Sequence, residues 1–276
     1  PNAPKTAVTA TAAEARRTTR FEEYIMIRHF NITRLAGSVQ STDPSRVVRL
    51  FPWVAWVTLL GVVGIFPEPV GAQAEHPLTG RRIAPTMGMG GADWLERSER
   101  QNEEKPEEAI EAIGVKPGMV VADVGAGVGY FTTRLARKVG PKGRVYANDI
   151  QPEMLARLQD RLEAEHIANV ETVLGTQSDP KLPVGKLDLI LMVDVYHELS
   201  QPQRMLNHMK RALKPGGRLV LIEYRKEDPS IPIRPEHKMS AAEVKTEVEA
   251  EGYALTEVLR TLPRQSIFVF RKLPPM

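Results

Sequence analysis

The sequence has 276 residues, which is long enough for one sizeable α/β domain with additional segments. It contains no cysteine, and this excludes disulfides, thiolate metal ligands and a cysteine nucleophile. The net charge is +3, but the basic excess lies in residues 1–74, and the remainder carries equal numbers of acidic and basic residues. Because residues 75–276 have no net charge, they give no electrostatic basis for nucleic-acid binding, and we expect no nucleic-acid partner.

The N-terminal part of the chain divides into two stretches of different composition. Residues 1–45 are rich in Ala, Thr, Ser and Arg with little apolar periodicity, and we expect them to form a disordered N-terminal extension. Residues 50–66 are apolar and uncharged, with two arginines before them and an Ala-x-Ala pattern after them. This layout is typical of a secretory signal peptide, so residues 46–74 predict a signal peptide or a membrane anchor.

A buried core helix is the remaining interpretation of residues 50–66, although such helices rarely lack every polar residue. If the segment acts as a signal or anchor, the protein is exported to the periplasm or contacts a membrane through residues 50–66. If it does not, we expect a cytoplasmic protein.

The rest of the chain alternates between apolar strands and amphipathic helices. Residues 75–91, rich in Pro, Gly and Met, predict a linker, and residues 92–276 predict one domain. Strands are expected at 119–124, 144–148, 170–174, 187–193, 218–224, 253–259 and 266–271, and helices at 92–113 with a break at Pro106, 130–139, 152–166, 200–213 and 240–251. This alternation predicts a doubly wound, mostly parallel α/β sheet with an antiparallel strand at its end.

Two details of the helices are predicted from local patterns. Ser200 with Gln203, and Ser240 with Glu243, have the spacing of capping boxes that begin a helix. In the first helical stretch, Trp94 is expected to be a packing residue.

The most informative stretch is GAGVG at 125–129, directly after the first predicted strand. Its glycines allow a sharp turn and a close approach of the backbone to a ligand. A dinucleotide and S-adenosylmethionine (SAM) are the competing ligands, and a glycine turn without any ligand is a third interpretation. The dinucleotide fingerprint requires Gly or Ala where this chain has Tyr130, which argues against a nicotinamide-dependent dehydrogenase.

An acidic residue, Asp149, follows the second predicted strand. A carboxylate in that place can accept hydrogen bonds from both hydroxyls of a ribose. It can also cap the helix that follows, and we favour ribose binding because the glycine turn lies in register with it.

Four separated motifs then agree with one another: VADVGAGVGYFT at 121–132, VYANDIQPEML at 145–155, LDLILMVDVYHEL at 187–199 and ALKPGGRLVLIEY at 212–224. In this order and spacing they resemble the class I SAM-dependent methyltransferases, in particular the type 11 group that includes quinone-biosynthesis methyltransferases. The resemblance implies a Rossmann-like sheet of seven strands, mostly parallel with an antiparallel last strand, and SAM as the cofactor. It does not specify the methyl acceptor.

The resemblance and the strand ends together indicate a set of cofactor-binding residues. Asp123 is expected near the amino end of the methionine moiety, and Ile150 against the adenine. Family members often carry an acid directly after the third strand, where this chain has Thr176, so Gln177 or the displaced Asp179 is expected to contact the adenine. The full expected set is Asp123, Gly125, Ala126, Gly127, Gly129, Asp149, Ile150, Gln177, Asp179 and Asp194.

Candidate catalytic residues follow the fourth strand, because ligands of doubly wound folds bind outside the carboxyl ends of the strands. They are Tyr196, His197 and Glu198. His197 is the candidate general base because imidazole titrates near neutral pH, and a structural histidine at the start of the next helix is the alternative. His237 and Lys238 are expected on the opposite wall.

Two adjacent arginines precede the predicted domain. Arg81 and Arg82 can clamp an acidic substrate or be plain surface charge, and we favour surface charge. No spacing of His, Asp and Glu singles out a ligand set, so we expect no metal.

The sequence therefore predicts a SAM-dependent methyltransferase that acts on an unidentified small molecule. The alternative is a protein that binds SAM or adenosine without catalysis, and the polar groups at 194–198 argue against it.

Overall fold

The structure, a computed structural model, describes residues 74–274. The expected N-terminal extension, the apolar run at 50–66 and all but the last residue of the predicted signal or anchor lie outside these residues. Between residues 74 and 274, no helix is long and apolar enough to cross a membrane.

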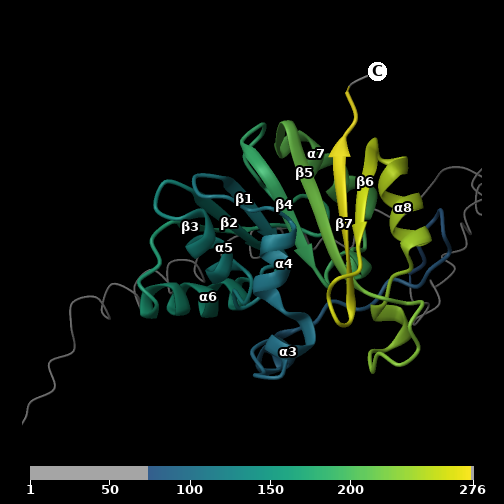
Figure 1. Cartoon of the computed structure of the whole chain (residues 1–276), viewed down its shortest axis with the longest axis horizontal. Helices are drawn as coiled ribbons and strands as arrows, with labels where there is room; N and C mark the ends of the chain where they lie inside the picture. The colour runs from purple at the N-terminus through teal and green to yellow at the C-terminus, as the bar shows by residue number, and fades with distance from the viewer. Residues whose placement is uncertain (1–73, 275–276) are drawn as a thin grey trace, which may run out of the picture. The chain divides into compact units, whose positions relative to one another are not determined.

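A seven-stranded sheet forms the centre of the described domain, in the order β3-β2-β1-β4-β5-β7-β6 (Figure 1). β7 runs antiparallel to both of its neighbours, and the other pairings are parallel. The predicted α/β sheet with an antiparallel last strand is confirmed. The strands are β1 Val120–Val124, β2 Arg144–Asp149, β3 Val170–Leu174, β4 Leu187–Val193, β5 Leu213–Tyr224, β6 Tyr253–Leu259 and β7 Gln265–Lys272.

Helices cover both faces of the sheet. α4, α5 and α6 pack on one face, and α7 and α8 pack on the other (Figure 1). The described helices are η1 Met89–Gly91, α2 Ala92–Leu95, α3 Arg100–Glu104, α4 Pro106–Ala112, α5 Thr132–Val139, α6 Pro152–Ala164, η2 Tyr196–Glu198, α7 Pro202–Ala212, η3 Pro235–His237 and α8 Ala241–Ala250.

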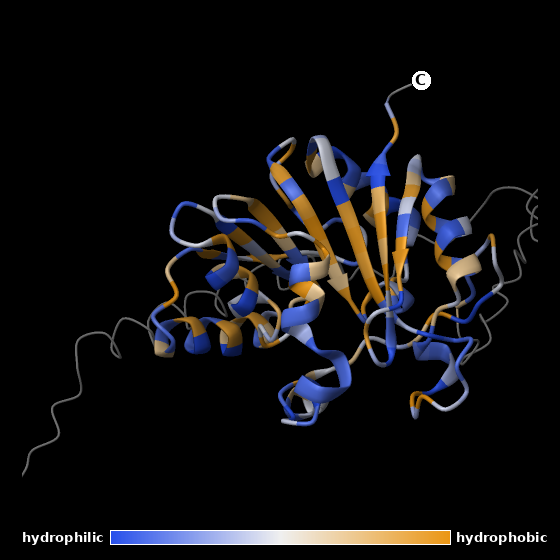
Figure 2. Ribbon diagram, viewed as in Figure 1, coloured by the Kyte–Doolittle hydropathy of each residue, from blue (hydrophilic) through white to orange (hydrophobic). Residues whose placement is uncertain are grey.

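The central strands are continuous apolar runs because both of their faces are buried. In β4, Leu189 and Leu191 pack with the helices of one face, and Ile190 and Met192 pack with those of the other. All four side chains are completely buried. Figure 2 shows the apolar residues gathered in the strands, while the helices alternate between apolar and polar sides.

The helix starts confirm one capping prediction and correct the other. Ser240 and Glu243 form the predicted capping box at the start of α8. The predicted box at Ser200 is wrong, because α7 begins at Pro202 and the Ser200 hydroxyl donates to Gln177 Oε1 at 3.3 Å instead. Proline is well suited to the first helical position, and it places the start of the helix one residue later than the Ser200 pattern requires.

The first helical stretch is more divided than expected. The predicted break occurs at Pro106, which begins α4 after Lys105 in the left-handed conformation (φ 48°). A second break, not predicted, separates α2 from α3.

The segment expected as a linker, residues 75–91, packs against the domain. Arg81 Nε donates to Glu247 Oε1 at 2.9 Å, and both side chains are buried. Arg81 Nη1 also donates to the backbone oxygen of His197 at 3.1 Å. The expected surface position is therefore wrong for Arg81 and correct for the exposed Arg82. A carboxylate as deeply buried as that of Glu247 requires a paired cation, and Arg81 supplies it.

This ion pair leads to a prediction about stability. Arg81→Ala leaves the Glu247 carboxylate buried with the loss of its guanidinium partner, and we expect it to lower the free energy of unfolding by about 3–5 kcal/mol. Arg82→Ala, the matched control at an exposed neighbour, should change it by less than about 0.5 kcal/mol. Urea titration of both variants measures the difference. Equal stability of the two variants would show that the segment is not anchored by this pair.

Candidate active site

A cavity of about 520 Å³ opens at the carboxyl ends of the parallel strands. Its walls come from the segments that follow β1, β2, β4 and β5, from residues 232–237, and from the segment between Thr86 and Arg100. The strand order changes direction between β1 and β4, where doubly wound folds bind their ligands. The volume falls within the roughly 300–1,000 Å³ of small-molecule sites.

The glycine turn follows β1 and forms part of this wall. Gly125 has φ +76°, and a Cβ there would lie 2.4 Å from Val195 Cγ2. Gly129 has φ +87°, and a Cβ there would lie 2.2 Å from Leu158 Cδ1. Gly125, Ala126 and Gly127 line the cavity, but Gly129 does not. The structure therefore does not bring Gly129 to the cavity with the other glycines, and this glycine makes room for Leu158 of α6.

Asp149, at the end of β2, holds the glycine turn and the next helix together. Its Oδ2 accepts from Gly127 N at 2.8 Å, and its Oδ1 accepts from Gln151 N at 2.9 Å. Burial raises the pKa of the Asp149 carboxyl, and the hydrogen bonds from the backbone oppose that shift. The side chain also lines the cavity. A carboxylate can accept about four hydrogen bonds, so Asp149 keeps some capacity to accept from a ligand.

Two more carboxyls lie at the strand ends. Asp123 Oδ2 accepts from the Thr132 hydroxyl at 2.6 Å, and burial raises the pKa of Asp123 to about 6. Asp194 Oδ2 accepts from Gln265 Nε2 at 2.7 Å. Asp194 Oδ1 is buried and has no hydrogen-bond partner among the described residues. Burial, with the nearby carboxylate of Glu104, raises the pKa of Asp194 well above its ordinary value.

Of the residues expected to contact the adenine, the structure brings two to the cavity. Ile150 and Gln177 line the cavity. Asp179 does not, because its carboxylate accepts from Lys181 N at 2.8 Å and pairs with Lys181 Nζ at 2.8 Å. The structure therefore does not bring Asp179 together with the other expected cofactor residues at the cavity.

His197, in η2, is buried and lines the cavity. Its Nδ1 lies 2.7 Å from Oε2 of Glu223, and the other oxygen of Glu223 accepts from Tyr196 N at 2.8 Å. Glu223 is completely buried at the carboxyl end of β5. Because a carboxylate only accepts, the proton of a neutral His197 is placed on Nδ1, and Nε2 keeps a lone pair.

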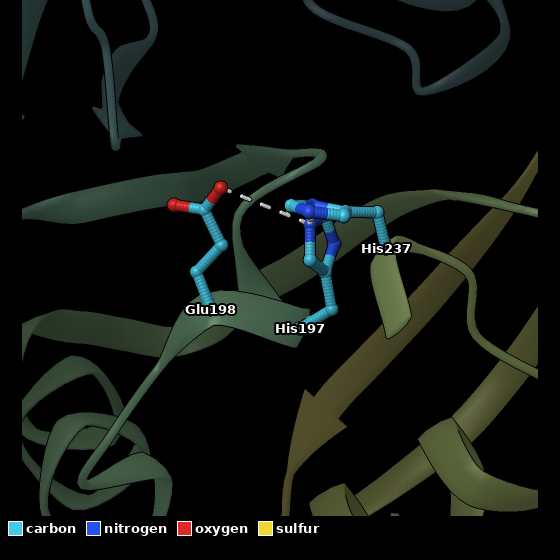
Figure 3. A group of neighbouring side chains, drawn as sticks. All are labelled: His197, Glu198 and His237. Atoms are coloured by element: carbon cyan, nitrogen blue, oxygen red, sulfur yellow. Dashed lines mark hydrogen bonds and ion pairs between the residues drawn. The ribbon is translucent and has the colours of Figure 1, made fainter. Parts of the chain in front are cut away.

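Two further side chains meet His197 Nε2 (Figure 3). His237 Nδ1 lies 3.1 Å away, and Glu198 Oε1 lies 3.9 Å away. Glu198 Oε2 accepts from Met87 N at 3.3 Å. Burial raises the pKa of Glu198 to about 7, whereas burial and the neighbouring His197 lower the pKa of His237.

Two other expected site residues, Tyr196 and Lys238, do not line the cavity. Tyr196 is completely buried in the core beside α7 and α8 and does not line the cavity, because the tight turn of η2 directs it away from His197. It is therefore removed from the catalytic candidates. The Lys238 ammonium donates to Ile231 O at 2.7 Å, so of the expected pair only His237 reaches the cavity.

Sequence reasoning missed Glu223 and the wall formed by the supposed linker. Met87 O accepts from Gln151 Nε2 at 2.9 Å, which fixes this segment across the cavity. Trp94, expected to be a packing residue, is 40% exposed and lines the cavity. The one sequence signal for Glu223 was an acidic residue near the end of an otherwise apolar predicted strand.

Comparison with known proteins identifies the family. Residues 115–265 match the family model of a methyltransferase domain. The structure is similar to that of a SAM-dependent methyltransferase from Aquifex aeolicus, with 30% identity and a TM-score of 0.64 over 67% of this chain and 98% of that one. A putative type 11 methyltransferase from Sulfolobus solfataricus has the same fold, with 23% identity and a TM-score of 0.53 over 63% of this chain and 95% of that one.

Among curated proteins, the chain is 34% identical over 119 residues to the ubiquinone/menaquinone biosynthesis C-methyltransferase UbiE of Hydrogenovibrio crunogenus. The match covers 43% of this chain and 47% of that protein, so the chain spans about half the length of the curated relatives it matches. The domain match, the similar structures and the fold lead to one conclusion: the chain belongs to the SAM-dependent methyltransferase family, whose cofactor is S-adenosylmethionine.

Proposed function

We propose that this protein transfers a methyl group from SAM to a small-molecule acceptor, and that His197 takes up the proton that the acceptor loses. The observation that carries the proposal is the pair of His197 and Glu223, which presents a lone pair on Nε2 in the wall of a cofactor-sized cavity. A protein that only stores SAM has no need of an oriented histidine there.

The cavity suits a cationic adenosine cofactor. Asp123, Asp149, Asp194 and Glu198 all line it, while Arg100 and Arg234 are its cations. The buried, unpaired Oδ1 of Asp194 is an acceptor suited to the cofactor's amino group. Asp149 lines the cavity and can accept from the ribose hydroxyls, and Ile150 and Gln177, which also line it, are proposed to contact the adenine. When bound, SAM supplies an electrophilic methyl group on a positively charged sulfur.

The work left to the protein is positioning and proton removal. The walls exclude water and hold the acceptor in line, and His197 Nε2 accepts its proton. Glu223 keeps the ring in the productive orientation and stabilises the imidazolium that forms, because its buried carboxylate lies 2.7 Å from Nδ1.

The acceptor side of the cavity indicates the class of substrate. Leu199, Met205, Pro232 and Ile233 contribute apolar surface, and Arg234 is the nearby cation. We therefore propose a small acceptor with an apolar body and one ionisable heteroatom. The curated relatives are named for carbon methylation in quinone biosynthesis, and for this chain the acceptor is proposed only as a class.

The first test concerns ribose binding by Asp149. Asp149→Asn keeps the size of the side chain but removes the charge, and a hydrogen bond to a charged group contributes about 1.5–3 kcal/mol. We expect calorimetry to show that SAM binds about tenfold more weakly or worse. Asp179→Asn is the matched control, because its carboxylate lies outside the cavity, and it should bind SAM like the wild type. If both variants bind SAM equally, Asp149 acts only in holding the turn.

The second test concerns His197. In His197→Asn the amide can still donate to Glu223, so the buried carboxylate keeps a partner while Nε2 is lost. We expect methyl transfer from labelled SAM into fractionated cell extract to fall by about 10²-fold or more, with SAM affinity retained. His208→Asn, a histidine outside the cavity, should retain activity. A His197→Asn variant with most of the wild-type turnover would rule out the proton-accepting role.

A further inference from the structure

Three ligand atoms converge in the wall of the cavity. His197 Nε2, His237 Nδ1 and a carboxylate oxygen of Glu198 all lie within 4.8 Å of one another (Figure 3). His197 and Glu198 come from η2, and His237 comes from η3, forty residues along the chain. Two imidazoles and one carboxylate form a set of ligands that binds divalent transition metals in catalytic sites.

The distances are close to those that one shared ion requires. Zn²⁺ lies about 2.0–2.1 Å from imidazole nitrogen, so two nitrogens in tetrahedral positions are about 3.3 Å apart. His197 Nε2 and His237 Nδ1 are 3.1 Å apart. The Glu198 Oε1 is 3.9 Å from His197 Nε2, somewhat farther than this spacing, and all three ligand atoms lie within 4.8 Å of one another.

The surroundings of His197 also match those of a metal ligand. A histidine that binds a metal commonly donates a hydrogen bond from the N–H of its other ring nitrogen to a carboxylate, and this contact fixes the tautomer and the ring orientation. Glu223 provides this contact at 2.7 Å, and it is held in turn by Tyr196 N at 2.8 Å. Glu198 is held in the same way, since its second oxygen accepts from Met87 N at 3.3 Å. The cluster is thus oriented from outside by contacts that leave its three ligand atoms facing one another.

We infer that His197, Glu198 and His237 bind one divalent transition-metal ion in the wall of the cofactor cavity. Three protein ligands leave at least one coordination position for the acceptor's heteroatom. The ion would lower the pKa of that heteroatom and so favour its deprotonation, with the proton released to solvent. The metal site itself follows from the cluster alone, and only its role in methyl transfer rests on the proposed function. In the metal-loaded protein Nε2 is a ligand, and in the metal-free protein it is the proton acceptor.

The test uses full-length, tag-free protein that has been stripped with a chelator, and Zn²⁺ as the probe. Calorimetry and metal analysis after dialysis should give one Zn²⁺ per chain for the wild type. His237→Ala and Glu198→Ala should each bind Zn²⁺ about 10-fold more weakly or worse, while His208→Ala, the control histidine, binds as the wild type does. Co²⁺ substitution should give a visible absorption band that His237→Ala loses. Mg²⁺, which prefers oxygen ligands, should not compete.

Each outcome tests either the metal site or the role of the ion in methyl transfer. A wild type that retains no Zn²⁺, or a His237→Ala variant that binds Zn²⁺ like His208→Ala, overturns the metal site. Circular dichroism of each variant separates loss of the site from loss of the fold. SAM binding and methyl transfer are measured separately on the stripped and the Zn²⁺-loaded protein. Zn²⁺ binding without methyl transfer contradicts the proposed function and leaves the site intact, whereas equal transfer by both forms removes the ion's catalytic role.

Discussion

The cavity wall around His197 depends on the burial of one carboxylate, that of Glu223. Glu223 has no exposed surface, and a buried charge is costly unless both of its oxygens are paired. Tyr196 N and His197 Nδ1 supply those partners at 2.8 and 2.7 Å. Because the two donors are consecutive residues, the carboxylate also fixes the direction of η2. Tyr196 is then turned into the core, and His197 and Glu198 face the cavity.

The part of the cavity formed by the ends of β1 and β2 was predictable because it depends on short stretches of sequence. A strand buried on both faces is an unbroken apolar run, and a turn with positive φ is a glycine, so β1, β4 and the turn at Gly125 follow from short stretches of sequence. Asp149 was predictable from its position relative to that turn alone. The parallel order then brings the strand ends together without further information, because their carboxyl ends share one edge.

The part of the cavity around His197 was less predictable because its contacts join residues far apart in the sequence. Glu223 and His237 meet His197 from two other elements, and no spacing along the chain connects the three. Arg81 was assigned to the surface because most arginines are exposed, but the buried Glu247 on a distant helix determines its position. At Ser200 two local patterns competed, and proline at 202 decided where α7 begins.

The electrostatics of the cavity connect the fold to the choice of ligand. Burial raises the pKa of Asp123, Asp194 and Glu198. The cause is that burial removes water from the ionised carboxylates and the nearby protein charges do not fully compensate for that loss. Arg100 is the cation that lowers the pKa of both Asp123 and Asp194, and it is already paired with Glu104 at 2.7 Å. A positively charged ligand would stabilise the ionised carboxylates, so we expect the cavity to attract cationic ligands. By the same argument, a bound ligand that loses one positive charge loses part of this attraction, so we expect the cavity to hold the charged methyl donor more strongly than the neutral thioether that remains after transfer.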